Sequence, residues 1–268
     1  MHKRMNENMQ CHLARELAVA RRTNGVMAAQ GLEELNNFAD AYRLQESVRV
    51  ELGATVVGWK LAQPQAAEVI SAPLFDIGCM GSDAFLADAA LLRDGVECEL
   101  ALRIDHSLPI GACTRDDVMA AIGAVMPAFE LLCSRLPAKF ASPREHIVAD
   151  GMGHGAVVLG APCADWRGLD FAEMRVTLWA DDAPVVEKQG GNPFGDPVHA
   201  VALLANHLSG RGQTLAAGTF VLAGSHTGLH RARPGERLRC VFEGIGRVAL
   251  NVRELDPAIS KEHGHAGR

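Results

Sequence analysis

Residues 96–104, VECELALRI, alternate between apolar side chains and polar or small ones with a period of two. This alternation predicts a β-strand, because successive side chains of a strand point to opposite faces. Glu97 and Glu99 therefore share one face. Two carboxylates on one face repel each other unless a cation or a basic residue lies between them. The pair indicates either a strand face that is open to water or a site that binds a cation.

The rest of the chain mixes helices with many further strands. Residues 9–22 have helical spacing, and a second helix is predicted from about residue 37 to Gly53. A third helix is predicted to begin at Thr114 and to end near Pro127. Strand-like segments recur from there to the end of the chain without regular alternation with helices. This order argues against a Rossmann-type sheet and against a TIM barrel.

We therefore predict an α+β fold, in which N-terminal helices precede a mixed, strongly curved β-sheet with flanking helices. The predicted division is a helical N-terminal region at residues 1–54 and a larger domain at residues 55–268. A chain of 268 residues, of which 48% are hydrophobic, can bury a full core and is not intrinsically disordered.

Composition excludes several classes of function. A net charge of −6 and an aromatic content of 5% argue against nucleic-acid binding, which needs basic patches and stacking side chains. The seven cysteines form no C-x-x-C pair, which argues against a disulfide framework and a structural zinc site. The sequence shows no signal peptide and no apolar stretch of membrane-spanning length. We therefore expect a cytoplasmic protein that binds neither nucleic acid nor membrane.

Glu130 lies inside an apolar run, PAFELLCS. A buried carboxylate costs several kcal/mol unless it is paired with a cation or bound to a metal. One explanation is an ion pair with Arg135 or with a nearby lysine. The other is that Glu130 joins Glu97 and Glu99, since three carboxylates with no histidine near them in sequence suit Mg²⁺ or Mn²⁺.

Two other segments carry candidate functional residues. Lys60, in GWKLA, follows a valine-rich strand and could have a lowered pKa or hold an anionic substrate, although a surface lysine would fit the same pattern. Residues 224–228, GSHTG, follow a strand and could present backbone N–H groups and hydroxyls to a carboxylate, or form an ordinary turn. His154, His226 and His230 are predicted to be non-catalytic.

The order of these motifs is more specific than any one of them. VVGWKLA, ECELALRI, VMPAFELLCSR, VADG and LAAGTFVLAGSHTG follow one another between residues 38 and 252. This series resembles the 2-keto-4-pentenoate hydratase / 2-oxo-3-hexenedioate (4-oxalocrotonate) decarboxylase family of the fumarylacetoacetate hydrolase superfamily. The resemblance implies a fumarylacetoacetase C-terminal-like β-roll, with the catalytic domain at residues 55–268.

The resemblance also implies roles for particular residues. It implies a divalent metal, Mg²⁺ or Mn²⁺, held by Glu97, Glu99 and Glu130, and it implies that Lys60 is the catalytic lysine. The residues that it implies for substrate binding are Ser225, Thr227, Leu61 and Asp150.

The implied activity is that of a metal-dependent lyase acting on 2-oxo or 2-hydroxydienoate acids of aromatic catabolism. The expected reaction is hydration of 2-hydroxypenta-2,4-dienoate to a 4-hydroxy-2-oxo acid. The alternatives are a 2-oxo-3-hexenedioate decarboxylase, an acylpyruvate-type C–C hydrolase, and an inactive member that serves as a scaffold. The expected partners are a small 2-oxo acid and further copies of the chain in a homo-oligomer, with association with a pathway enzyme as an additional expectation.

One departure from the hydratase pattern bears on this choice. Leu74 occupies the position at which the hydratases carry an acid/base aspartate, which favours the decarboxylase. Asp76 lies two residues further on, and whether it replaces the missing aspartate is left open by the sequence.

Overall fold

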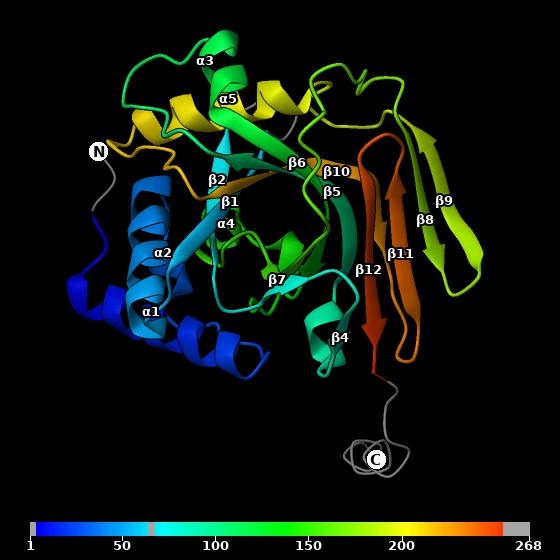
Figure 1. The fold of residues 1–268 in the computed structure, drawn as a ribbon. Coiled ribbons are helices and arrows are strands. Elements are labelled where there is room, and N and C mark those ends of the chain that lie inside the picture. The colour runs from blue at the N-terminus through cyan, green and yellow to red at the C-terminus, as the bar shows by residue number, and fades with distance from the viewer. Residues whose placement is uncertain (1–3, 64–67, 254–268) are drawn as a thin grey trace.

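The computed structural model describes residues 4–63 and 68–253 (Figure 1). Its helices are α1 (Glu7–Arg22), α2 (Phe38–Leu52), α3 (Arg115–Ala121), α4 (Arg144–Ala149) and α5 (Pro197–Ser209). Short 3₁₀ turns cover Leu32–Glu34, Ala89–Leu92 and Lys139–Ala141. Within these described ranges, no helix is both long and apolar enough to cross a membrane.

The larger of the two described sheets curls into a half-barrel (Figure 1). Its strands, in spatial order, are β2 (Ile70–Phe75), β1 (Val56–Ala62), β10 (Phe220–His230), β5 (Gly95–Ile104), β6 (Ile122–Leu132), β7 (His154–Leu159) and β3 (Cys79–Gly81). Strands β1 and β10 pair in parallel, whereas β10, β5, β6 and β7 pair antiparallel. The sheet is therefore mixed and curved, which confirms the predicted fold class.

A second sheet packs against the first through β11 and β12. Its described strands, in spatial order, are β4 (Ala84–Leu86), β12 (Gly246–Val252), β11 (Arg237–Phe242), β8 (Arg175–Ala180) and β9 (Ala183–Gln189). The main apolar core lies between the sheets and extends to α5, which packs on β10 and β5. One face of the central strand β5 packs on this core, and the other lies towards the interior of the half-barrel.

The N-terminal helices lie where the sequence predicts them, although α1 begins two residues earlier than expected, at Glu7. The side chain of Asn6 caps α1, and that of Asn37 caps α2 by accepting a hydrogen bond from Asp40 N at 2.9 Å. Gly53 ends α2 in the left-handed conformation, with φ 65°. Helices α1, α2 and α4 share a separate apolar cluster. The boundary at residues 54 and 55 stays a prediction, and residues 254–268 lie outside the described part of the chain.

One predicted helix is wrong in its extent. The helix that begins at Thr114 ends at Ala121, and Ile122 is already extended, with φ −79° and ψ 117°. Residues 122–132 form β6 and pair along their length with β5. Apolar residues at helical spacing fit a buried strand equally well, because a strand covered on both faces is apolar throughout. Pairing with β5, which no local pattern reveals, decides the outcome.

Candidate metal centre

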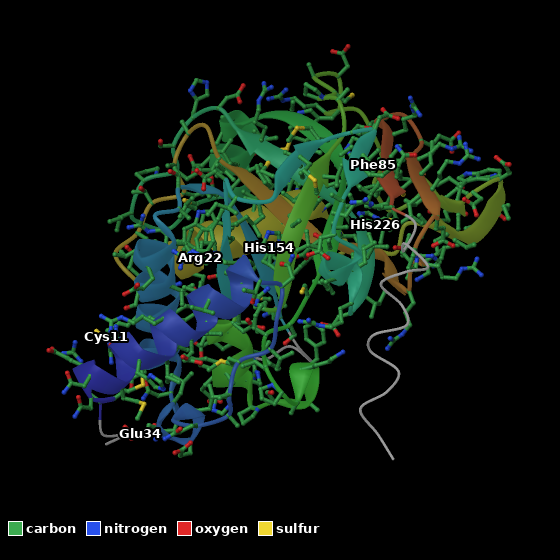
Figure 2. All side chains as sticks on the ribbon, turned by 90° about the horizontal axis from the view of Figure 1, so that it is seen from below. Cys11, Arg22, Glu34, Phe85, His154 and His226 are labelled. Carbon is green, nitrogen blue, oxygen red and sulfur yellow. The ribbon has the colours of Figure 1, made fainter. Side chains whose placement is uncertain are left out.

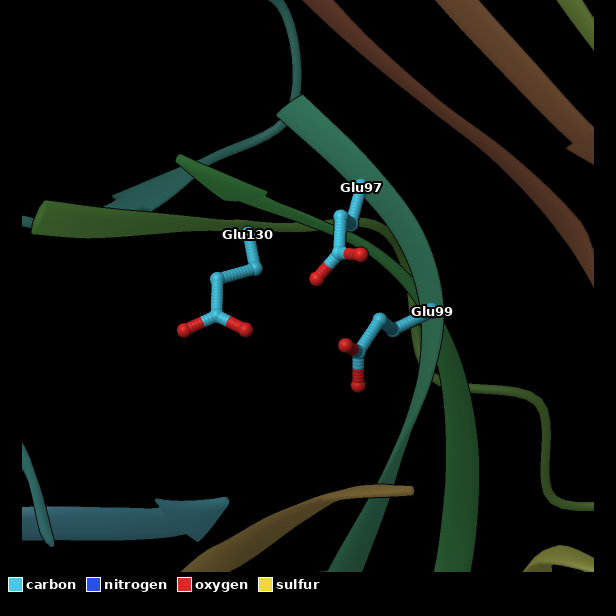
Figure 3. A group of neighbouring side chains, drawn as sticks. All are labelled: Glu97, Glu99 and Glu130. Carbon is cyan, nitrogen blue, oxygen red and sulfur yellow. The ribbon is translucent and has the colours of Figure 1, made fainter. Parts of the chain in front are cut away.

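Three carboxylates converge on the inner face of the curled sheet (Figure 3). Glu97 and Glu99 lie two positions apart on β5, so that their side chains point the same way. Glu130 lies directly opposite Glu97 in the β5–β6 pair. One carboxylate oxygen from each of the three lies within 4.8 Å of the others. The register of the two neighbouring strands β5 and β6 therefore brings these three residues together, as predicted.

The oxygens of this cluster fit a hard divalent cation. Glu130 Oε2 is buried and has no hydrogen-bond partner among the described residues. A buried carboxylate oxygen without a hydrogen-bond donor destabilises the protein unless a cation binds to it. Carboxylate oxygens are the ligands that Mg²⁺, Mn²⁺ and Ca²⁺ prefer, and three of them within 4.8 Å of one another are close enough to face one cation.

Lys60 supplies one positive charge to the cluster. Its Nζ lies 2.6 Å from Glu130 Oε1. Burial acts to lower the pKa of Lys60, but the three carboxylates outweigh it and raise the pKa, with Glu130 contributing most. The suggestion of a lowered pKa for this lysine is therefore wrong for the metal-free site. When all three carboxylates are ionised, they leave two negative charges beside one ammonium group, which is the charge that a divalent cation would neutralise.

The carboxylates differ in their electrostatic environment. Burial raises the pKa of Glu99 well above its usual range, and the charges of Glu130 and Glu97 add to the shift. Burial and the charge of Glu130 likewise raise the pKa of Glu97. Burial also opposes ionisation of Glu130, but Lys60 and His154 outweigh it and lower the pKa of Glu130. Glu130 is thus the carboxylate that the protein itself keeps ionised.

His154 is a site residue that the sequence did not reveal. It begins β7 and lies among the strands inside the molecule (Figure 2). It is fully buried, and its Nδ1 lies 2.9 Å from Glu130 Oε1. Burial lowers the pKa of His154 to about 4, so the ring is neutral at physiological pH. An ionised carboxylate only accepts hydrogen bonds, and Nδ1 must therefore carry the proton. The contact is compatible with the expectation that His154 is not itself catalytic. Glu130 and His154 are 24 residues apart in sequence, so no local pattern reveals their contact.

A cavity of about 670 Å³ opens beside the carboxylates. Lys60, Leu61, Glu97, Glu99 and Ser225 line it. The other walls are mostly apolar and include Ile70, Leu132, Phe140, Ile147, Met152, Phe194 and Leu229. Pockets of this size with a few converging polar groups are typical of small-molecule sites. The structure therefore brings Lys60, Leu61 and Ser225 together with the three carboxylates.

Residues 224–228 are part of β10 and not a separate loop. Gly224 has φ 95°, and a side chain there would meet Pro193 at 2.5 Å, so that only glycine fits. This conformation directs Gly224 N to Glu99 Oε2, at 2.9 Å. The pairing of β10 with β5 is irregular on both sides of Ser225, which lies opposite Glu99. Gly224 and Ser225 line the cavity at this irregularity.

Two of the implied substrate contacts lie away from the cavity. Thr227 Oγ1 accepts a hydrogen bond from Cys98 N and donates one to Gly228 O, which ties β10 to β5. Asp150 forms a buried ion pair with Arg135 at 2.6 Å. Neither Thr227 nor Asp150 lines the cavity. The positions of Thr227 and Asp150 indicate structural roles. Of the two partners that the sequence suggests for Glu130, an arginine at position 135 or a lysine, the structure shows the lysine, Lys60.

The structure also answers the question about Asp76. Its side chain is exposed and accepts hydrogen bonds from Thr55 N and Ile77 N, at 2.9 and 3.0 Å. Leu74 is fully buried in an apolar cluster with Met126 and Leu222. Neither residue lines the cavity, so Asp76 does not bring a carboxyl group into it in place of the aspartate that Leu74 replaces.

Residues 82–253 match the family model described as fumarylacetoacetate (FAA) hydrolase C-terminal. The chain is 27% identical over 251 residues to a 4-oxalocrotonate decarboxylase of Pseudomonas putida, which covers 84% of this chain and 92% of that protein. It is 29% identical over 223 residues to a 2-keto-4-pentenoate hydratase of Paraburkholderia xenovorans, which covers 79% and 82%.

A solved structure is similar over nearly the whole chain. It is the 4-oxalocrotonate decarboxylase of Pseudomonas putida G7 in complex with magnesium and adipate, with a TM-score of 0.84 and 25% identity. The match covers 93% of this chain and all of that one.

Proposed function

Because the chain belongs to the fumarylacetoacetate hydrolase family, we propose that it is a metal-dependent lyase acting on a small 2-oxo or 2-hydroxydienoate acid. The observation that carries the proposal is the convergence of Glu97, Glu99 and Glu130 beside Lys60, of which Lys60, Glu97 and Glu99 line one cavity. Relatives named as hydratases and decarboxylases support the reaction class, and a relative solved with magnesium supports the metal.

Glu97, Glu99 and Glu130 are the residues that would hold the cation. When bound, a divalent cation supplies Lewis-acid stabilisation of the negative charge that develops on a 2-oxo acid as it forms an enolate. The protein's part is to keep these ligands in one place and to surround them with a largely apolar cavity. In such surroundings electrostatic interactions are stronger than in water.

Lys60 is the residue that we assign to the reacting end of the substrate. Its raised pKa means that the free site holds it as an ammonium group, which can bind an anionic oxygen or donate a proton. Ser225 lines the same cavity as Glu99, and its hydroxyl can contact the polar end of the acid, while Gly224 N holds Glu99 Oε2 in place. The apolar walls accommodate its carbon chain.

Hydration of 2-hydroxypenta-2,4-dienoate is the reaction that we propose first. Decarboxylation of 2-oxo-3-hexenedioate is the second candidate, and the burial of Leu74 together with the outward position of Asp76 favours it. Apart from the proposed ligands Glu97 and Glu99, no carboxylate lies among the described cavity-lining residues. A hydratase would therefore have to move its protons through Lys60 or the carboxylates of the cluster.

An assay of both acids with and without Mg²⁺ tests the proposal. Metal-dependent loss of dienoate absorbance without release of CO₂ supports the hydratase, whereas CO₂ release from the diacid supports the decarboxylase. Cleavage of an acylpyruvate would instead identify a C–C hydrolase. If none of these acids is turned over in a metal-dependent way, the result would contradict a catalytic function and favour the alternative of an inactive member that serves as a scaffold.

We also place the protein in the cytoplasm as a homo-oligomer. All seven cysteines are free thiols, the usual state in a reducing compartment. Val19 on α1 and Val50 on α2 are exposed apolar side chains that a second copy could cover. Light scattering of the purified protein tests the oligomer, for which a monomer is the contrary result.

A further inference from the structure

The two oxygens of the Glu130 carboxylate have different surroundings. Oε1 accepts from two donors, Lys60 Nζ at 2.6 Å and His154 Nδ1 at 2.9 Å. Oε2 has no donor among the residues that the structure describes, and it is buried. The carboxylate is therefore fixed through one oxygen, which leaves the other free for a cation.

The two donors differ in their freedom to move. Lys60 lines the cavity, at the end of a long and flexible side chain, where it can turn to a bound anion. His154 does not line the cavity and is fully buried. Its carbonyl accepts a hydrogen bond from Arg135 at 2.6 Å. His154 is thus the donor that stays in place.

The turn before His154 holds the ring in position. Gly153 has φ 72°, and a side chain there would meet the ring of Phe140 at 2.6 Å. Arg135 is itself fixed by its buried ion pair with Asp150. Packing and hydrogen bonds on both sides therefore restrict the backbone from which the imidazole extends.

We propose that His154 is a positioning residue that keeps Glu130 Oε2 available to the cation when Lys60 turns to the substrate. Without it, a buried carboxylate would lose its last donor at that moment and could rotate away from Glu97 and Glu99. The part that concerns the substrate rests on the proposed function. The part that concerns cation affinity does not.

Equilibrium binding of Mn²⁺, followed by electron paramagnetic resonance, tests this role without any substrate. We expect His154→Leu to weaken Mn²⁺ binding by about 10-fold or more, the usual effect of losing a hydrogen bond to a metal ligand. His154→Asn should remain within about 3-fold of the unaltered protein, because the asparagine Nδ2 can take the place of the imidazole Nδ1. His154→Gln, whose amide reaches further, should not restore binding.

A double variant at His154 and Lys60 tests whether the two donors can replace each other in holding Glu130 Oε1. The loss caused by His154→Leu should be larger in a Lys60→Met background, in which no second donor remains for Glu130 Oε1. Equal losses in both backgrounds would overturn the proposal. His146→Leu is the matched control, because His146 also makes a ring-nitrogen hydrogen bond, at 3.1 Å to Leu35 O, away from the carboxylates.

Unchanged Mn²⁺ affinity in folded His154→Leu would overturn the proposal. If that variant does not fold, the comparison of Asn with Gln decides, and equal affinities of these two variants would also overturn it. Turnover of none of the acids, combined with the expected order of Mn²⁺ affinities, would overturn the proposed function and leave this role of His154 intact.

Discussion

Lys60 Nζ and Glu130 Oε1 lie 2.6 Å apart although β10 and β5 separate their strands in the sheet. The pair therefore spans the inner face of the half-barrel and does not run along one hairpin. Both side chains are almost completely buried. This contact places the proposed cation-binding carboxylates and the proposed catalytic ammonium group in a fixed relation, and the curvature of the sheet makes it possible.

Removal of the ammonium group should affect turnover more than cation binding. We expect Lys60→Ala to lower kcat by about 10²–10⁴-fold, the usual range for a group that transfers a proton. Mn²⁺ affinity should change by less than about 10-fold, since His154 still holds Glu130. Steady-state kinetics and Mn²⁺ titration measure the two effects. The reverse order would make Lys60 a structural residue.

Neutralising Glu130 should abolish metal-dependent activity and preserve the fold. Glu130→Gln keeps the shape of the side chain but removes the charge that the cation and Lys60 both require. The far-ultraviolet circular dichroism spectrum should be unchanged, while Mg²⁺-dependent turnover falls below detection. Full activity in this variant would show that the ligand assignment is wrong.

Cation binding should weaken as pH falls. The pKa values of Glu97 and Glu99 are raised by burial and by the neighbouring carboxylates, so protons compete with the cation. In the metal-free protein these groups bind more protons folded than unfolded, and their contribution to stability decreases as pH rises from the usual carboxyl range through the raised values. The increase in Tm caused by Mg²⁺ should therefore be larger at about pH 8 than at about pH 5. A constant increase would contradict the assignment.

The ion pair of Asp150 with Arg135 should be structural. Asp150→Asn leaves the buried guanidinium without its counter-charge, and we expect the free energy of unfolding to fall by about 3–5 kcal/mol. Urea denaturation measures this loss. Unchanged stability together with a raised KM would instead support the implied role of Asp150 in substrate binding.

The sequence was informative where a local pattern carried the constraint. Period-two alternation placed Glu97 and Glu99 on one face of a strand, and an apolar run marked Glu130 as a carboxylate that needs compensation. The N-terminal helices are recognisable from their spacing, and the second also from its asparagine cap, whereas the Asn6 cap of the first helix is a finding of the structure. Each of these inferences depends on residues that are close together in the chain.

Contacts between distant segments could not be derived in this way. His154 reaches Glu130 only because β7 pairs with β6, and Asp150 meets Arg135 only because the turn before β7 folds back. The same limit explains β6, part of which the local pattern predicts as helix, whereas its pairing with β5 makes it a strand. Which polar residues share a cavity depends on sheet register and curvature, and no single segment encodes either.

Binding of Mn²⁺ to the purified protein tests the central claim most directly. We predict that each chain binds one Mn²⁺, that Mg²⁺ displaces it, and that binding is lost when Glu97, Glu99 or Glu130 is replaced by alanine. Replacing the exposed Glu46, which pairs with Arg49 on α2, should leave binding unchanged. Absence of binding at millimolar Mn²⁺ or Mg²⁺, or binding that survives loss of all three carboxylates, would contradict the account.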